Sequence, residues 1–372
     1  MLILRPVAEA DLDALVDLAH QLDSLNLPSD REFLTQRIAA SLRSFAEVQG
    51  GEAAGQRRAA EPSPGTQGGE GAGQHGAAEQ SQEGWQSGVY VFVVEDTETR
   101  RCVGTSTILA KRGVPAAPYF WLEVTTEERR SALLDRRFVH TKLQLLSTED
   151  GPTEIGGLIL DPAYRHHPDK CGKALSVVRF AFISQYPERF ERDVIAEMLS
   201  PFEESGENLL WNAFGARFTG LSYHEADRLS ARSKQFIADL FPRDAVYATL
   251  FPESVQATIG KTAADQAVAI LEKVGFRYLH QVDPFDGGPY YGAARDAISS
   301  VRDRRRLVLP GLPFEGIVPA LGTLALLSAD AQFGFRATVV PLDCDGAPLV
   351  SKECREALGV TAGDEVLVTP LP

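Results

Sequence analysis

The sequence predicts a mixed α/β (α+β) fold with a small β-rich domain at its C-terminal end. Three observations support this expectation: a strand–turn–helix unit over residues 154–190, strand and helix patterns on both sides of that unit, and a change to short strands after residue 305. The chain has 372 residues, of which 44% are hydrophobic. This length accommodates two domains with a sizeable core.

The first elements are a short strand that leads into an amphipathic helix, over residues 2–20, and two further strands around an acidic turn, over residues 89–108. Between them lies a segment rich in Gly, Ala, Gln and Glu that contains two near copies, GGEAAGQRRAAE and GGEGAGQHGAAE. Since it has almost no apolar residues, it cannot form a core. We therefore predict that residues 48–86 are a disordered, low-complexity insertion in a surface loop.

The strand–turn–helix unit begins with an apolar strand over residues 154–160, which an Asp-Pro pair ends, and a helix starts near Gly172. A helix N-terminus presents unpaired N–H groups to an anion. Three cations of the turn would strengthen that field: Arg165, Lys170 and Lys173. The pattern predicts a phosphate-binding turn, and a plain strand–turn–helix with solvated basic residues is the alternative.

The remaining elements in order are a strand over residues 193–198, a helix over 263–276 and the stretch RYLHQVDPFDGGP that follows it. After residue 305 the pattern becomes FRATVVPL, a DCDGAP turn, a short helix and GDEVLVTPL. We therefore expect one large domain over residues 1–305 and a small β-rich domain over 306–372.

Composition narrows the class of protein. No apolar run is long enough to cross a membrane and no secretory signal is present, so a membrane or secreted protein is disfavoured. Four separated cysteines without a CxxC pair fit a reducing cytoplasm, and no residues show metal-ligand spacing. The net charge of −14 argues against a nucleic-acid partner and fits a cationic substrate.

Several motifs recur in one order: ILRPV, VFVVEDTET, LDPAYR, QYPERF, VIAEM, WNAFGARF, ADRLSARSKQFIADLFPR, LEKVGFRY and VDPFDGGP. Together, from Met1 to about Asp303, they resemble the arginine N-succinyltransferases, which are the arginine/ornithine succinyltransferase subunits of bacterial arginine degradation. The resemblance implies a GNAT-type acyltransferase fold and transfer of succinyl from succinyl-CoA to the α-amine of arginine or ornithine. It also implies a small amino-acid substrate, no metal, and a homo- or hetero-oligomer with a homologous subunit.

The resemblance and the residues suggest roles for individual side chains. Leu158 matches the position that contacts the succinyl-CoA thioester, and the turn that carries Gly172 would hold the pyrophosphate. Glu154 and Glu197 match family glutamates, and either could act as a base through water. Three further carboxylates would line an acidic substrate pocket: Glu123, Asp227 and Asp286. A structural role as turn or cap residues is the alternative for each.

The chain departs from the family at three places. A family His, taken as the proton donor, is missing after Ile259-Gly260, and His224 is a candidate replacement. Glu123 stands where the family has an Arg, which would reverse a preference for a carboxylate. The turn after Arg165 is longer than the Gly-rich family loop. Two alternatives therefore stay open: an acyltransferase with another acyl-CoA or amine, and a non-catalytic partner subunit.

Overall fold

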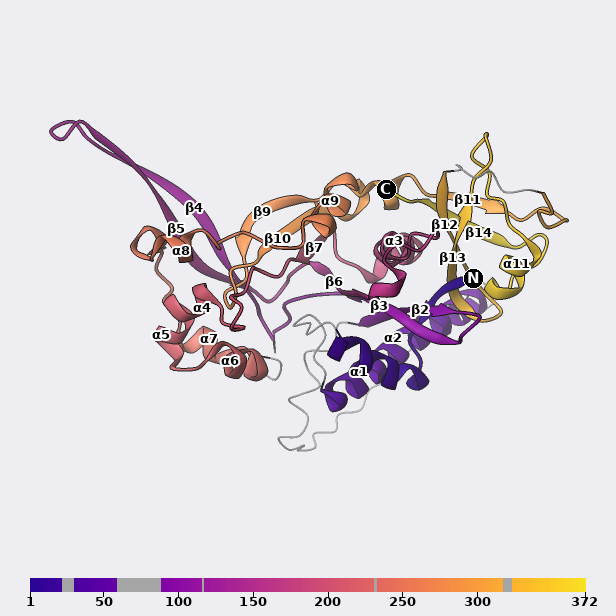
Figure 1. Ribbon diagram of the computed structural model, residues 1–372. Coiled ribbons are helices and arrows are strands. Elements are labelled where there is room, and N and C mark those ends of the chain that lie inside the picture. The colour runs from indigo at the N-terminus through magenta and orange to yellow at the C-terminus, as the bar shows by residue number, and fades with distance from the viewer. Residues whose placement is uncertain (22–29, 59–87, 116, 231–232, 317–322) are drawn as a thin grey trace. The chain divides into compact units, whose positions relative to one another are not determined.

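The computed structural model describes residues 1–21, 30–58, 88–115, 117–230, 233–316 and 323–372 (Figure 1). Internal contacts divide the chain into two compact units. Unit 1 consists of residues 1–108, 157–185 and 303–371, and unit 2 of residues 109–156 and 186–302. The chain thus passes between the units several times, whereas the sequence placed a single domain boundary at residue 305.

Unit 1 is built on a mostly antiparallel sheet with the strand order β11-β14-β12-β13-β1-β2-β3. In chain order these strands are β1 Leu2–Pro6, β2 Val89–Asp96, β3 Arg101–Leu109, β11 Arg305–Val308, β12 Leu324–Ala331, β13 Gly334–Pro341 and β14 Glu365–Pro370. β2 reads VYVFVV and is buried along almost its whole length, because a strand covered on both faces needs apolar residues at consecutive positions.

The helices of unit 1 are α1 Leu12–Gln21, α2 Arg31–Arg58, α3 Cys171–Gln185 and α11 Lys352–Leu358. α3 is buried nearly all round, which explains why its sequence is apolar on every face. Its Phe182 ring lies 5.2 Å from Phe45 of α2 and 5.1 Å from Phe335 of β13. An aromatic cluster therefore joins α2 and α3 to the sheet.

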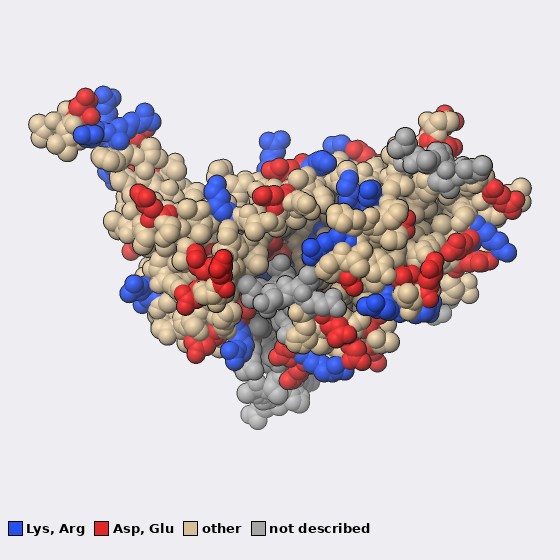
Figure 2. Space-filling view, viewed as in Figure 1, with Lys and Arg blue, Asp and Glu red and all other residues tan. Residues whose placement is uncertain are grey.

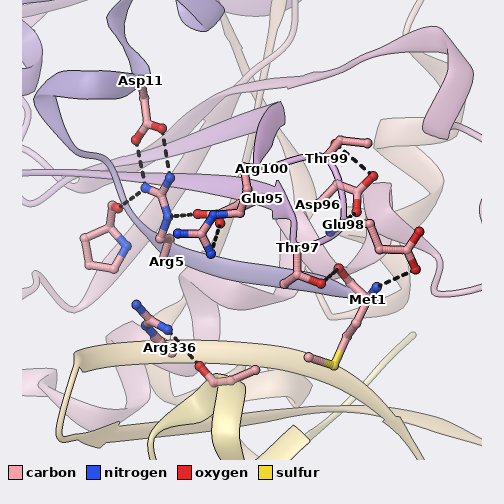
Figure 3. A network of polar contacts seen from close by, with 12 residues as sticks. Met1, Arg5, Asp11, Glu95, Asp96, Thr97, Glu98, Thr99, Arg100 and Arg336 are labelled. Carbon is pink, nitrogen blue, oxygen red and sulfur yellow. Dashed lines mark hydrogen bonds and ion pairs between the residues drawn. The ribbon is translucent and has the colours of Figure 1, made fainter. Parts of the chain in front are cut away.

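Arg5 anchors the first strand of unit 1 through a polar network (Figure 3). Its guanidinium donates to both carboxylate oxygens of Asp11 at 2.8 Å, and its Nε donates to Glu95 Oε2 at 2.6 Å. Arg100 reaches the other oxygen of Glu95 at 3.2 Å. Because Arg5, Asp11 and Glu95 are largely shielded from water, the bidentate pair fixes β1 against β2 and the first helical turn.

The predicted β-rich C-terminal segment is present but is not separate from the N-terminal part. β13 pairs with β1 at Leu4 and Ala337, and Thr338 Oγ1 donates to the Leu2 carbonyl at 2.8 Å. Its own apolar cluster forms where β12, β13 and β14 pack with α11. The segment therefore extends the sheet of unit 1.

Part of the segment that was predicted to be disordered is helical. α2 continues to Arg58, so residues 48–58 are helical, and the expectation is corrected there. The reason is that this stretch contains Ala, Glu, Gln and Arg, which favour helix, and its first Pro follows at Pro62. The rest of the predicted insertion, residues 59–86, lies outside the described residues.

Unit 2 holds the sheet order β6-β7-β10-β9-β4-β5-β8. Its strands are β4 Tyr119–Ser131, β5 Arg136–Thr148, the first half of β6 Thr153–Leu160, β7 Asp193–Glu197, β8 Val246–Tyr247, β9 Arg277–Val282 and β10 Pro289–Ala294. β6 pairs in parallel with β7 at Thr153–Val194 and Glu154–Ile195. The second half of β6 belongs to unit 1, so this strand links the two units along the chain.

Short helices complete unit 2: α4 Leu209–Ala213, α5 Gly215–Thr219, α6 Tyr223–Ser230, α7 Gln235–Leu240, α8 Glu253–Gln256, α9 Asp265–Lys273 and α10 Ser299–Arg302. Trp211 is fully buried and stacks on Phe285 at 5.3 Å, as expected of a core residue. Phe214 is buried too, whereas Phe218 of the same motif is 41% exposed. Within the described ranges, no helix is both long and apolar enough to span a membrane.

Candidate active site

Strand β6 and helix α3 form the predicted strand–turn–helix unit, and its turn and helix lie in unit 1. Leu158 is 37% exposed, while the two residues that follow it are buried. Gly157 before it has φ +55°, and a Cβ there would lie 3.0 Å from Thr107 Oγ1. The backbone therefore leaves regular strand geometry next to Leu158, which favours Gly at this position.

The turn between β6 and α3 holds the predicted cations. Arg165 and Lys170 are exposed, Gly172 and Lys173 are half-buried, and all four lie at or before the first turn of α3. Lys170 has φ +52°, and its carbonyl accepts the Ala174 N–H at 3.0 Å to begin the helix. The turn thus combines an N-terminus of a long helix with three cations, the arrangement that suits a phosphate group.

A cluster of ionisable side chains forms a second candidate site, entirely within unit 2. Arg112 bridges two strands there. Its Nη1 contacts Glu154 Oε2 of β6, and its Nη2 lies 3.5 Å from Glu197 Oε2 at the end of β7. The three side chains keep only 19%, 14% and 29% of their surface exposed. The structure thus brings together the two glutamates that the sequence proposed as bases.

Tyr290 extends this cluster to the acidic turn before β10. Tyr290 lies directly opposite Glu197 in the register of β7 and β10. Its hydroxyl lies 3.1 Å from Glu197 Oε2 and 3.1 Å from Asp283 Oδ2. A tyrosine hydroxyl has one proton to donate, so it satisfies both carboxyl groups only if one of them is protonated or the proton is shared.

Asp286 is buried, and its carboxylate is occupied by hydrogen bonds with the backbone. Its oxygens accept the N–H groups of Ser200 at 3.0 Å and Gly288 at 2.7 Å. Asn208 donates to the Asp286 carbonyl at 3.0 Å and caps α4 through the Trp211 N–H. Asp286 therefore shapes the turn, as its structural alternative predicted, while its charge still adds to the acidity of the cluster.

The electrostatics of the cluster favour a protonated Glu197. Burial and then the Asp283 charge raise the pKa of Glu197 to about 8, although Arg112 opposes the shift. Burial and Asp283 likewise raise the pKa of Asp286 to about 7. Burial raises the pKa of the Tyr290 hydroxyl well above its usual value. At neutral pH the group placed to release a proton is therefore the Glu197 carboxyl.

The α6–α7 region adds two ionisable side chains near Asp283, those of Asp227 and Lys234. Lys234 Nζ lies 5.5 Å from the Phe285 ring centroid, and burial lowers its pKa. Burial, then Asp283, raises the pKa of the half-buried Asp227. His224 is exposed on α6, and its described contact is a ring contact with Tyr223 at 5.7 Å. Asp227 thus belongs to the acidic surroundings, whereas within the described part of the chain His224 forms no hydrogen bond or ion pair with Glu154 or Glu197.

Glu123 lies on β4, between β5 and β9. Side chains alternate along a strand, so Tyr119, Trp121 and Glu123 share one face. Tyr119 of that face stands edge-on to the Tyr290 ring at 5.6 Å, and the Arg112 guanidinium lies 5.5 Å from its ring centroid. The face that carries Glu123 is therefore the face that carries the ionisable cluster.

The segment of the missing family His lies beside the acidic turn. Gly260 donates its N–H to the Gly287 carbonyl at 2.9 Å, and Thr262 Oγ1 donates to the Leu199 carbonyl at 2.6 Å. The side chain of Lys261, which lies between these two residues in the chain, is exposed. The Ile259-Gly260 segment thus lies next to the acidic turn, and its sequence contains no His.

Sequence reasoning missed four members of the cluster: Arg112, Tyr119, Lys234 and Tyr290. Arg112 follows a strand in the ordinary surface pattern AKRG, and Glu154 is 42 residues further along the chain. The aromatic PYY sequence before GAA, directly after the DPFDGG turn, was the available signal for Tyr290.

Comparisons with known proteins identify the family of the chain. Residues 72–300 match the family described as arginine N-succinyltransferase beta subunit. The arginine N-succinyltransferases of Citrobacter koseri and Yersinia pseudotuberculosis are 31% and 32% identical, with all of this chain and 98% of each relative covered. The solved arginine/ornithine succinyltransferase subunit AI from Pseudomonas aeruginosa superposes with a TM-score of 0.75 at 27% identity, covering 100% of this chain and 99% of that one. The chain therefore belongs to the arginine N-succinyltransferase family, with a GNAT-type acyltransferase fold.

Proposed function

We propose that the protein transfers the succinyl group of succinyl-CoA to the α-amine of arginine or ornithine, as a step of arginine catabolism in the bacterial cytoplasm. The observation that carries the proposal is the buried cluster in which Arg112 joins Glu154 and Glu197, next to Tyr290 and Asp283. A family of acyltransferases supplies the reaction class, and the cluster supplies groups that can accept and donate a proton.

Succinyl-CoA, as co-substrate, would bind at the β6–α3 turn. Its phosphates suit the N-terminus of α3 together with Arg165, Lys170 and Lys173. The thioester would lie against Leu158, where the positive φ of Gly157 turns the backbone out of regular strand geometry. The oxyanion formed on the thioester carbonyl needs an N–H donor, which a splayed strand can provide.

The amine nitrogen attacks the thioester carbonyl carbon, the new C–N bond forms, and the C–S bond breaks. We assign the base to Glu154, through water, because it lies at the ion pair with Arg112 and an α-amine of pKa near 7.7–8.0 needs only a modest base. We assign the proton donor for the leaving thiolate to Glu197, whose raised pKa keeps it protonated near neutral pH. Glu197 is thereby removed from the role of base that the sequence left open to it.

The basic side of the substrate would be attracted by the negative cluster. Asp283, Asp286 and Asp227 add acidic charge around Glu197. A guanidinium or ammonium group would replace the repulsion between these carboxylates by attraction.

One observation favours a related function with a different acyl group or amine. Glu123, on the same face of β4 as Tyr119, is an anion where the family has a cation. An anion facing the substrate would disfavour a carboxylate there. The missing His keeps a non-catalytic partner subunit as the second candidate, and the Pseudomonas protein, being a subunit AI, is compatible with association of homologous chains.

Release of free CoA from a panel of acyl-CoAs with arginine, ornithine and lysine tests the proposal. CoA binding by calorimetry is measured in parallel for the wild type and Lys173→Glu, with Lys352→Glu as the control because Lys352 also lies in the first turn of a helix. We expect weaker CoA binding only for Lys173→Glu. CoA binding without release in any combination would replace the enzyme by the partner subunit, and unchanged affinity of Lys173→Glu would remove the phosphate site.

A further inference from the structure

Beyond the site, the most unusual feature of unit 2 is the outer part of the β4–β5 hairpin. β9 joins β4 at Leu122 and Glu123, and β8 joins β5 at Lys142 and Leu143. Further out, from the Thr126–Thr141 pair to the Ser131–Arg136 pair, β4 and β5 have only each other as strand partners among the described residues. We call residues 126–141 the arm, and Figure 1 shows it projecting from the rest of unit 2.

The base of the arm is braced, but its tip is not. Tyr247 of β8 donates its hydroxyl to Glu127 at 2.8 Å and meets the His140 ring at 5.8 Å. Four large apolar side chains lie beyond these contacts with high exposure: Leu133 93%, Leu134 67%, Phe138 58% and Val139 57%. A two-stranded ribbon without a buried face is marginal in water, and its open edges and apolar tip invite another surface.

The tip is also basic, on a chain that is strongly acidic. Residues 129–137 carry four arginines and one aspartate, whereas the whole chain has a net charge of −14. Arg129 and Arg137 are paired within the arm with Glu127 and Glu128. Arg130 lies directly opposite Arg137 in the register, and like charges in that position destabilise an isolated hairpin. Figure 2 shows this cluster of blue side chains at the end of the projection.

We propose that the arm docks onto the acidic surface of a second copy of this chain. Copies that each carry a net charge of −14 repel one another, so association needs a local basic surface, and the arm supplies one together with apolar contacts. The same net charge would repel a polyanion from most of the molecule, which disfavours a nucleic acid as occupant. A two-fold pair would exchange arms reciprocally, each tip resting on the other copy.

The oligomeric state of the full chain tests this assignment, through sedimentation velocity and light scattering across a wide range of concentrations. The first variant is Leu133→Ser with Leu134→Ser, and the second is Arg130→Glu with Arg136→Glu. The control is Leu312→Ser, an equally exposed apolar residue of unit 1 at 82% exposure. We expect a dimer for the wild type and the control, and a dissociation constant raised at least about tenfold for both arm variants.

A shortened chain separates a docking role from a folding role. Glu128 and Val139 face each other in the register, so Asn-Gly in place of residues 129–138 closes the ribbon with a two-residue turn. We expect a monomer with an unchanged melting temperature. Dimers that persist in all three variants, or a wild type that stays monomeric, would overturn the proposal. A monomer that co-sediments with phosphatidylserine-containing vesicles through these residues would instead assign the tip to a membrane surface.

Discussion

Replacing Glu197 by Gln removes the ionisation that the buried cluster perturbs most clearly. The folded-state pKa of Glu197 is about 8, against 4.5 for an unperturbed glutamate. Between these values the carboxyl is protonated in the folded chain and ionised in the unfolded chain, so unfolding releases a proton. Its stabilising contribution is therefore fully present below pH 4.5 and is lost as the pH rises through 8.

The size of this effect follows from the linkage relation. One proton released on unfolding changes the free energy of unfolding by at most about 1.4 kcal/mol per pH unit. From pH 5 to 8 the upper bound is about 4 kcal/mol, and we expect about 2 kcal/mol because Glu197 keeps part of its side chain in contact with water. Asp286, with a folded-state pKa of about 7, contributes in the same direction at lower pH, so the window from pH 7 to 8 reports mainly on Glu197.

Urea denaturation at a series of pH values from 5 to 8.5 measures the effect. The wild type should lose stability with rising pH, and Glu197→Gln should lose less, most visibly above pH 7. Glu204→Gln serves as the control, since Glu204 is an exposed carboxylate of the same unit. Parallel pH profiles for the wild type and Glu197→Gln would refute the argument, because they would mean that Glu197 ionises as an ordinary surface residue.

Two further changes test the scaffold of the site. Arg112→Met should lower the free energy of unfolding by about 3–5 kcal/mol, since it leaves Glu154 buried without its cation. Lys111→Met is the control and should cost far less, because the ion-pair partners of Lys111 are exposed. Equal losses of stability in the two denaturation curves would contradict the pairing of Arg112 with Glu154. Gly157→Ala should lower the free energy of unfolding by about 1–2 kcal/mol, because the φ angle of Gly157 is +55°. Gly172→Ala is the control and should leave the thermal denaturation curve nearly unchanged, since there is room for its Cβ. An unchanged stability of Gly157→Ala would argue against the positive φ at this position.

The local elements of the fold could be predicted from the sequence because local patterns determine them. The apolar run of β6, the Asp-Pro stop after it and the apolar helix α3 appear where they were expected. Pairing between distant segments has no local signal. For example, β13 pairs with β1 in a register that places Leu4 opposite Ala337. No periodicity within either strand specifies that pairing.

The same limit applies to the candidate site. Glu154 and Glu197 were predicted from motifs, and the structure brings them to one cation. Arg112 was not predicted, because a basic residue after a strand is usually a solvated one and only the tertiary fold buries it. The motif also could not distinguish the two glutamates. Their difference arises from burial and from Asp283, which raise the pKa of Glu197.

In the proposed mechanism, Glu197 takes the place of the missing family His as the proton donor. A CoA thiolate needs a proton as it leaves, and a thiol of pKa near 8.5 is matched by a carboxyl group of pKa about 8. The Tyr290 hydroxyl, 3.1 Å from both Glu197 and Asp283, gives that proton a path back from the acidic turn. If Glu197 has this role, the rate of CoA release should fall as the pH rises through about 8, because the donor becomes ionised, and Glu197→Gln should lose this alkaline limb together with most of the activity. A limb that persists in Glu197→Gln would move the proton donor to another residue.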